Sequence, residues 1–251
     1  DRAGAGRPRL TGGGELTAVN SPAPNLDLPG PGSDVRAPTQ RPSRPPEIDL
    51  TDAPETAAPL IAADPAALEF LLTRRSRIAK TLTFPGPDRA TVEIMLKAAA
   101  RSPDHGKMEP WRFIVLAGEE AAKLGALTRS LGEARGVDPD RIEKHAEPFE
   151  LTPLTVAVVA SPKDTAKVPE VEQTLSAGAV CLALLNASLA SGWGANWLTA
   201  WMAQDREFLE TGLGIAPQEW VAGFIHIGTP TRPVSERPRP DMDAKVEWRG
   251  I

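Results

Sequence analysis

Apolar residues are irregularly placed over the first sixty positions of the chain and become periodic from about residue 65 onward. No Phe or Trp occurs before Phe70, and Pro, Gly, Ser, Thr and charged residues dominate the first segment. Such a segment cannot bury enough apolar surface to offset the ~1–2 kcal/mol per residue that ordering the backbone costs. We therefore expect residues 1–60 to form a mobile tail and residues 61–251 to form one domain.

Helical spacing of apolar positions predicts helices in the domain. The first covers the apolar residues from Ala67 to Leu72 and ends at the basic corner Arg74-Arg75-Ser76. Asp88 can cap a second helix that runs to about Arg101. Further helices are expected over residues 119–132 and 168–191. The middle of the last is rich in Ala, Ser and Gly, so we expect it at the centre of the fold or of a subunit contact.

Short apolar runs predict strands over residues 113–116, 154–160, 193–199 and 220–227. The run 154–160 is continuous and β-branched, which is typical of a central strand covered on both faces. Because helices are expected between the strands, the pattern predicts an α/β or α+β fold around one sheet.

Composition narrows the class of protein. A chain of 251 residues with 41% hydrophobic residues can bury one sizeable core. The net charge of −5 argues against nucleic acid or an anionic membrane surface as a partner. The apolar run 177–190 falls short of the ~20 residues of a membrane span and contains Asn186 and Ser188, which favours a buried core helix. Cys181 lies in this run, so we expect a buried thiol. No stretch has the pattern of a signal peptide, so we expect a reducing, cytoplasmic compartment.

Arg74-Arg75-Ser76 places two permanent cations and a hydroxyl together at a turn. Guanidinium groups bind phosphate oxygens through paired hydrogen bonds, so this corner suits a nucleotide-like phosphate. On its own the trio is also explained by the preference of cations for a helix C-terminus. The sequence has no Gly-x-Gly-x-x-Gly or Walker loop, which argues against a Rossmann dehydrogenase or an NTPase, and its three histidines lack the spacing of a metal site.

A second polar element begins about 27 residues later, over residues 101–113: Arg-Ser-Pro-Asp-His-Gly-Lys-Met-Glu-Pro-Trp-Arg-Phe. This loop resembles the nitroreductase-family signature, in which Pro and a polar pair are followed by Gln-Pro-Trp and the first strand. Three later segments are also similar to elements of this family and follow one another in the same order as in the family. They are Ser-Ala-Gly at 176–178, the segment 192–199, and the strand 221–230 that ends in Gly-Thr-Pro. The resemblance covers about residues 65–240 and implies an α+β fold, an α/β/α sandwich with a mixed, mainly antiparallel sheet flanked by helices.

The resemblance also implies a bound FMN held at the interface of a homodimer. Carried over position by position, the residues that would contact FMN are Arg74, Arg75, Ser76, Arg101, His105, Trp197, Leu198 and Thr199. Arg237 and Arg239 could correspond to a basic pair that holds the FMN phosphate in many members. The loop and the arginine corner could come from different subunits. No catalytic acid or base is assigned, because His105 is at least as well explained as a flavin-binding or structural residue.

By this resemblance the chain is expected to be an FMN-dependent oxidoreductase that passes electrons from NAD(P)H to a small organic acceptor such as a nitro compound or a quinone. It departs from the commonest family pattern at Lys107, Glu109 and Ile78, where Asn, Gln and Lys are usual, so a nitroaromatic preference does not follow. Two other functions stay open: a flavin-binding sensor or storage module without turnover, and an interaction protein that acts through its Pro-rich tail.

Overall fold

The structure, a computed structural model, describes residues 63–250. The tail predicted over residues 1–60 lies outside this range. Within it, a five-stranded sheet is built from the strands β1 (Leu82–Thr83), β2 (Trp111–Ala117), β3 (Leu154–Ala160), β4 (Gly194–Leu198) and β5 (Trp220–Pro230). The order is β1-β5-β3-β2, and β4 also pairs with β5.

All the described strand pairings are antiparallel. β3 lies between β2 and β5 and every one of its residues is buried, which confirms the predicted central strand. On the other edge of β5, β4 pairs with residues 224–228 and β1 with residues 229–230. The α+β class expected from the family resemblance is therefore confirmed.

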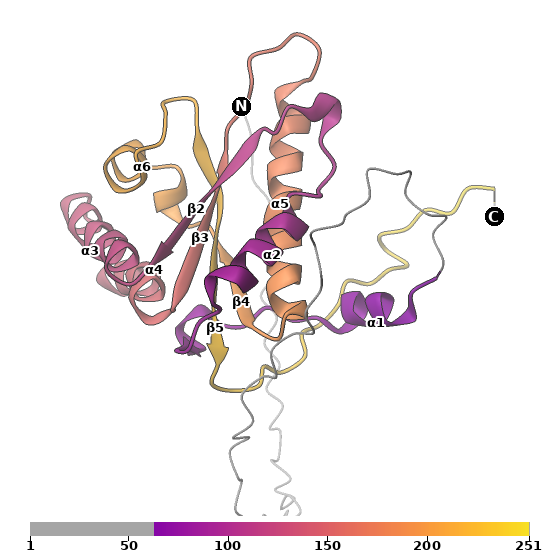
Figure 1. The fold of residues 1–251 in the computed structure, drawn as a ribbon, viewed down its shortest axis with the longest axis horizontal. Coiled ribbons are helices and arrows are strands. Elements are labelled where there is room, and N and C mark those ends of the chain that lie inside the picture. Colours follow the sequence, from indigo (N-terminus) through magenta and orange to yellow (C-terminus); the bar gives the residue numbers. More distant parts are fainter. Residues whose placement is uncertain (1–62, 251) are drawn as a thin grey trace, which may run out of the picture. The chain divides into compact units, whose positions relative to one another are not determined.

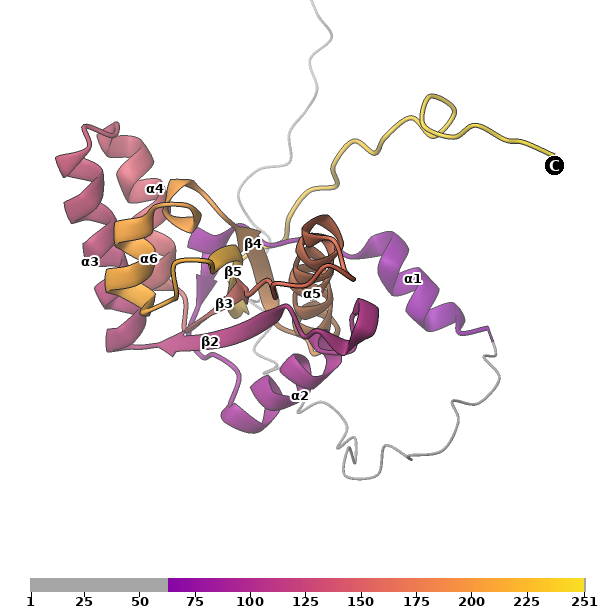
Figure 2. The same cartoon turned by 90° about the horizontal axis from the view of Figure 1, so that it is seen from above.

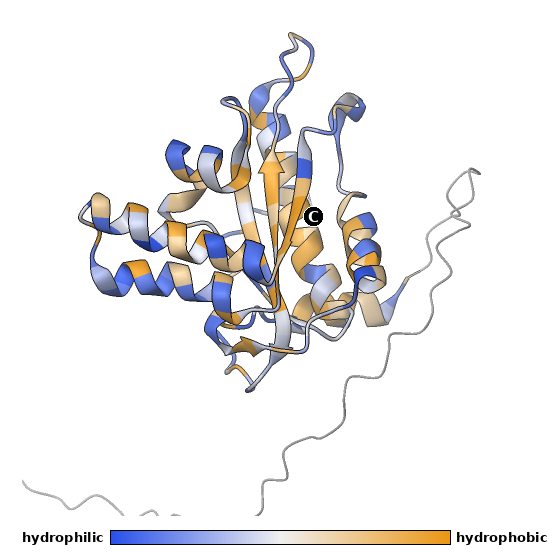
Figure 3. Ribbon diagram, turned by 60° about the vertical axis from the view of Figure 1, so that its left-hand side comes forward, coloured by the Kyte–Doolittle hydropathy of each residue, from blue (hydrophilic) through white to orange (hydrophobic). Residues whose placement is uncertain are grey.

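Helices cover both faces of the sheet, as Figures 1 and 2 show. One face packs on α2 (Arg89–Ala99) and α5 (Glu170–Ala190), and the other on α3 (Glu119–Ala134), α4 (Pro139–Leu151) and α6 (Arg206–Leu213). β3 contributes to a hydrophobic core on each face of the sheet, because successive side chains of a strand point to opposite faces. Val156 and Val158 face α5, whereas Ala157 and Val159 face the other helices. Figure 3 shows the apolar strands between helices that are hydrophobic mainly on their inner sides.

The local sequence explains where the helices begin. The carboxylates of Asp64, Asp88, Asp138 and Asp205 accept hydrogen bonds from the first turns of α1 (Pro65–Thr73), α2, α4 and α6. The predicted helix over 168–191 begins two residues later, at Glu170, because Val168 precedes a proline and is disfavoured from helical backbone, and Pro169 itself stands at the N-cap. The helix expected to reach Arg101 ends at Ala99.

Three elements were not expected from the pattern: α4, α6 and the two-residue β1. In α4 the buried residues are separated by charged ones and Pro148 lies within the helix, so no continuous apolar stripe stands out. The short 3-10 turns η1 (Ala79–Thr81), η2 (His105–Lys107) and η3 (Trp201–Ala203) complete the described elements.

Two parts of the described chain make few contacts with this core. α1 has no buried residue, and Leu68, Leu71 and Leu72 on it are 58–69% exposed. Residues 231–250 contain no helix or strand and run away from the sheet (Figure 1). Apolar side chains without a cover in one chain are candidates for contact with another.

α5 is the helix in the described part of the chain whose length and mean hydropathy of 1.4 would allow it to cross a membrane. Core helices of soluble proteins meet the same test, and α5 buries one side against the sheet, so the evidence for a span is weak. Cys181 on this side is fully buried, as predicted, and burial raises the pKa of its thiol to about 12.

Candidate active site

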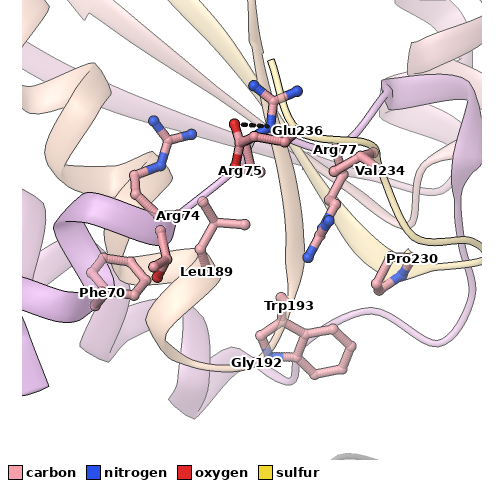
Figure 4. A pocket seen from close by; sticks show the side chains of 11 residues that line it. Phe70, Arg74, Arg75, Arg77, Leu189, Gly192, Trp193, Pro230, Val234 and Glu236 are labelled. Carbon is pink, nitrogen blue, oxygen red and sulfur yellow. Dashed lines mark ion pairs between the residues drawn. The ribbon is translucent and has the colours of Figure 1, made fainter. Parts of the chain in front are cut away.

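The arginine corner directly after α1 lines a cavity of about 600 Å³. Arg74, Arg75 and Arg77 line it from different directions, as Figure 4 shows. The remaining wall comes from the end of α5 and from the segments after β5: Leu189, Gly192, Trp193, Pro230, Val234 and Glu236, with Phe70 and Thr73 from α1. Segments about 115 to 160 residues apart in sequence thus meet at one cavity.

The predicted trio is held together at this corner. Nη2 of Arg74 donates to Oγ of Ser76 at 3.0 Å, and Nη2 of Arg75 donates to the carbonyl of Ser235 at 3.2 Å. Glu236 bridges two arginines, because its Oε1 lies 3.9 Å from Nε of Arg75 and 2.8 Å from Nη2 of Arg239. The structure therefore places Arg239 beside Glu236 at the corner. For Arg237 it gives only a backbone N–H bonded to Glu236 at 2.7 Å.

The electrostatics of the corner favour an anion. Burial lowers the pKa of Arg74, and repulsion from Arg239 and Arg75 lowers it further. Nε of Arg74 and Nε of Arg75 are buried and make no hydrogen bond within the described residues. Buried donors without acceptors are costly, so a ligand that carries oxygen acceptors would satisfy them. A phosphate has the charge and the acceptors that these donors require.

The second predicted element, the loop of residues 101–109, lies at the opposite end of α5. Ser176 on α5 donates to the carbonyl of Pro103 at 2.8 Å and accepts from the indole of Trp111 at 3.2 Å. His105 places Nδ1 2.7 Å from a carboxylate oxygen of Glu172. The loop is therefore fastened to the first turns of α5.

The two arginine-bearing elements do not meet within one chain. Glu172 holds the loop and Leu189 lines the arginine corner, which separates them by about 25 Å along α5. Arg101 is exposed at the end of α2 and lies outside the corner's cavity. Within one subunit, Arg101 and His105 thus form no common site with Arg74, Arg75 and Ser76.

The third predicted group lies on β4 and directly after it. Trp197 points toward α5 and donates from its indole N–H to the carbonyl of Ala222 at 3.2 Å. Leu198 points to the opposite face of the strand, where it lines a second cavity beside α4. Thr199 is exposed, and Ala200 after it has a positive φ of 55° that a side chain rarely adopts.

Several residues at these sites were missed by the sequence analysis. Trp193 and Leu189 of the first cavity were not named among the flavin contacts, and Glu236 drew no attention because it lies about 160 residues from Arg75. The α4 residues beside Leu198 were missed with their helix, although Asp138-Pro139 is a typical helix start. In residues 63–250 no three His, Cys, Asp or Glu side chains are grouped closely enough to hold a metal ion.

Solved structures share this fold. A nitroreductase-like family protein from Bacillus cereus superposes with a TM-score of 0.62 at 19% identity, over 76% of this chain and all of that chain. A Desulfovibrio desulfuricans protein described as "a putative nitroreductase" and solved in complex with FMN gives a TM-score of 0.59 at 22% identity, over 75% of this chain and 99% of that one. At such identities the likeness shows the fold, which is that of the nitroreductase-like α+β proteins.

Sequence comparison gives the family. The model of the Nitroreductase family matches residues 72–229. The Escherichia coli (strain K12) protein "Putative NAD(P)H nitroreductase YdjA" is 35% identical over 164 residues, which cover 65% of this chain and 88% of the relative. A Haemophilus influenzae protein is 34% identical over 165 residues with the same coverage. The chain belongs to the nitroreductase family and is an oxidoreductase enzyme.

Proposed function

We propose that this enzyme binds FMN and uses it to pass electrons from NAD(P)H to a small organic acceptor such as a nitro compound or a quinone. The observation that carries the proposal is the arginine corner, where two buried guanidinium nitrogens lack acceptors beside a cavity of about 600 Å³. Relatives named as NAD(P)H nitroreductases and a solved structure with FMN support the same cofactors. FMN would supply the electron transfer, while the protein holds and orients it.

In this proposal the FMN phosphate lies at Arg74, Arg75 and Arg239, and Ser76 orients Arg74 through their hydrogen bond. Arg237 would approach the phosphate from the same segment. The β4 end, residues 197–199, would lie against the ring. Arg101 and His105 would reach the flavin from the other subunit, because they lie too far away in their own.

We also propose that the enzyme is a homodimer built on α5. Val171, Leu175 and Leu182 form an exposed apolar stripe on this helix, 45–68% accessible, with the small residues Gly178 and Ala179 between them. The exposed apolar side chains of α1 offer further surface for a partner. Sedimentation should give a dimer for the wild type, and Leu175→Glu should shift it to a monomer with weaker FMN binding. A wild-type monomer that keeps FMN would overturn the shared site.

The redox proposal is tested with the full-length protein. The purified chain should be yellow, bleach anaerobically with NADH or NADPH, and regain its colour with a quinone or a nitro compound. Colour without bleaching would favour the sensor or storage module. A colourless chain that FMN cannot reconstitute would favour the interaction protein that acts through its Pro-rich tail. The free, buried Cys181 suits the reducing cytoplasm as the proposed compartment.

A further inference from the structure

Among the described residues that line the cavity of the arginine corner, Glu236 is the only acidic one. The other charged side chains of this lining are Arg74, Arg75 and Arg77, and the part of the wall that comes from the end of α5 carries no charge. Figure 4 shows Glu236 next to Arg75, with their ion pair drawn as a dashed line. An excess of positive charge thus surrounds one carboxylate that belongs to the protein itself.

Glu236 bridges two of the arginines proposed to bind the FMN phosphate. Its Oε1 lies 2.8 Å from Nη2 of Arg239 and 3.9 Å from Nε of Arg75. The backbone N–H of Arg237, and then the charges of Arg239 and Arg75, lower the pKa of Glu236, so its carboxylate is ionised at neutral pH. A phosphate oxygen bound between Arg75 and Arg239 would need the place that this carboxylate holds. The two anions would also repel each other.

The carboxylate is held weakly enough to be displaced. Its side chain is 64% exposed, and it lies in the segment 231–250, which has no helix or strand. At 3.9 Å its ion pair with Arg75 is too long for a hydrogen bond, so Nε of Arg75 stays buried without an acceptor. Exposed ion pairs of this kind contribute little to stability. A phosphate monoester has three acceptor oxygens and a larger negative charge than a carboxylate, so it competes well for the same arginines.

We propose that Glu236 is an internal competitor for the phosphate of FMN: without flavin its carboxylate pairs with Arg75 and Arg239, and FMN binding displaces it. This inference rests on the proposed function. Arg74, Arg75 and Arg239 repel one another, and the carboxylate partly neutralises them until the cofactor arrives. Displacing it reduces what the phosphate contributes to binding. Glu236 therefore determines how strongly the site distinguishes FMN from riboflavin, which has the same ring and no phosphate.

The experiment compares the two flavins in the wild type and in Glu236→Gln, which removes the charge and nearly keeps the size. The full-length protein is freed of flavin and titrated with each compound by fluorescence quenching. Glu236→Gln should bind FMN about fivefold more tightly, as expected when a mostly exposed competing ion pair is removed, and should bind riboflavin with unchanged affinity. The matched control is Glu247→Gln, because Glu247 pairs with Arg249 in the same segment, outside the cavity lining. It should leave both affinities unchanged.

Salt and stability give two further readouts that a merely structural glutamate would not produce together. The difference in FMN affinity between the wild type and Glu236→Gln should shrink in about 1 M NaCl, because salt screens exposed charges. Glu236→Gln should lower the melting temperature of the flavin-free protein, because the arginines lose their internal anion. Saturating FMN should remove most of that difference, since a ligand stabilises the form that binds it more tightly by a larger amount.

Two results for Glu236→Gln would overturn the inference and leave the proposed function intact. Weaker FMN binding would show that the carboxylate orients the arginines for the phosphate, and unchanged FMN binding would show that it does not compete. Equal tightening of riboflavin would overturn the inference as well, because the effect would then not depend on the phosphate. Failure of the wild type to bind either flavin would refute the proposed function itself.

Discussion

Gly223 on β5 permits a close approach that a single methyl group would abolish. A Cβ at this position would lie 2.2 Å from Nε1 and 2.5 Å from Cδ1 of Trp197, and 3.0 Å from Sγ of Cys181. The indole N–H of Trp197 donates to the carbonyl of the neighbouring Ala222. Gly223→Ala must therefore displace the indole and break this hydrogen bond. The substitution tests the packing of a predicted flavin contact without altering any charge.

The free energy of unfolding should fall by about 2–4 kcal/mol. Overpacking costs about 1–3 kcal/mol, and an indole left without its acceptor costs about 1–3 kcal/mol more. Alanine also lowers the conformational entropy of the unfolded chain, which stabilises the folded state by only about 0.4–1 kcal/mol. With a slope of about 2–3 kcal/mol per molar urea for a protein of this size, the midpoint should drop by roughly 1 M. Protein concentration must be fixed, because dimerisation shifts the midpoint.

A double-mutant cycle identifies the cause. Trp197→Val removes the atoms that the new methyl group would strike, so Gly223→Ala should cost little in that background. Equal costs of Gly223→Ala in both backgrounds would refute the proposed clash. So would an unchanged urea midpoint in the single variant. FMN titration of the same proteins then shows whether displacement of Trp197 also weakens the flavin site.

Three further predictions concern stability. Burial lowers the pKa of His226 to about 3, so the unfolded chain takes up a proton first as the pH falls. Stability should then decrease below pH 6.5 by up to about 1.4 kcal/mol per pH unit, and His226→Gln should flatten this dependence in urea titrations at pH 7, 5 and 4. Arg112 binds both carboxylate oxygens of Glu219, whose side chain is 7% exposed. Arg112→Met should therefore lower the free energy of unfolding by about 1–3 kcal/mol, and adding Glu219→Gln should restore most of that loss. Asp205 caps α6 and contacts Arg135, so Asp205→Ala should lower the melting temperature by an amount equivalent to about 1 kcal/mol, whereas an unchanged value would contradict the cap.

The fold could be predicted where one local signal dominated. The run 154–160 is apolar at nearly every position, which a strand covered on both faces explains. α4 and α6 gave no such signal, because each has a narrow buried face among charged residues, and α4 contains a proline. Tertiary packing stabilises these helices more than their own apolar pattern reveals. Their capping residues, Asp138 and Asp205, were visible in the sequence and went unused.

The candidate site, like the fold, could be predicted from the sequence only in part. Arg74, Arg75 and Ser76 are adjacent in the chain, so their chemistry could be interpreted from the sequence alone. The rest of the cavity wall could not be predicted from the sequence. Trp193 and Glu236 reach the corner only through the pairing of β4 with β5 and the path of the chain after β5. The second cavity depends on α4 and was therefore invisible to a pattern that missed that helix.

The length of α5 explains why the predicted flavin contacts fall into two groups. The helix holds His105 at its first turns through Glu172 and borders the arginine corner at its last turns through Leu189, about 25 Å away. No rearrangement of loops within one subunit closes that distance, since both ends are fastened by hydrogen bonds or packing to the same rigid helix. An antiparallel pairing of two α5 helices would set the first turns of one beside the last turns of the other, and it would cover the exposed stripe from Val171 to Leu182 in the same step. The apolar stripe and the divided site thus support the same proposal, a homodimer that pairs the two α5 helices.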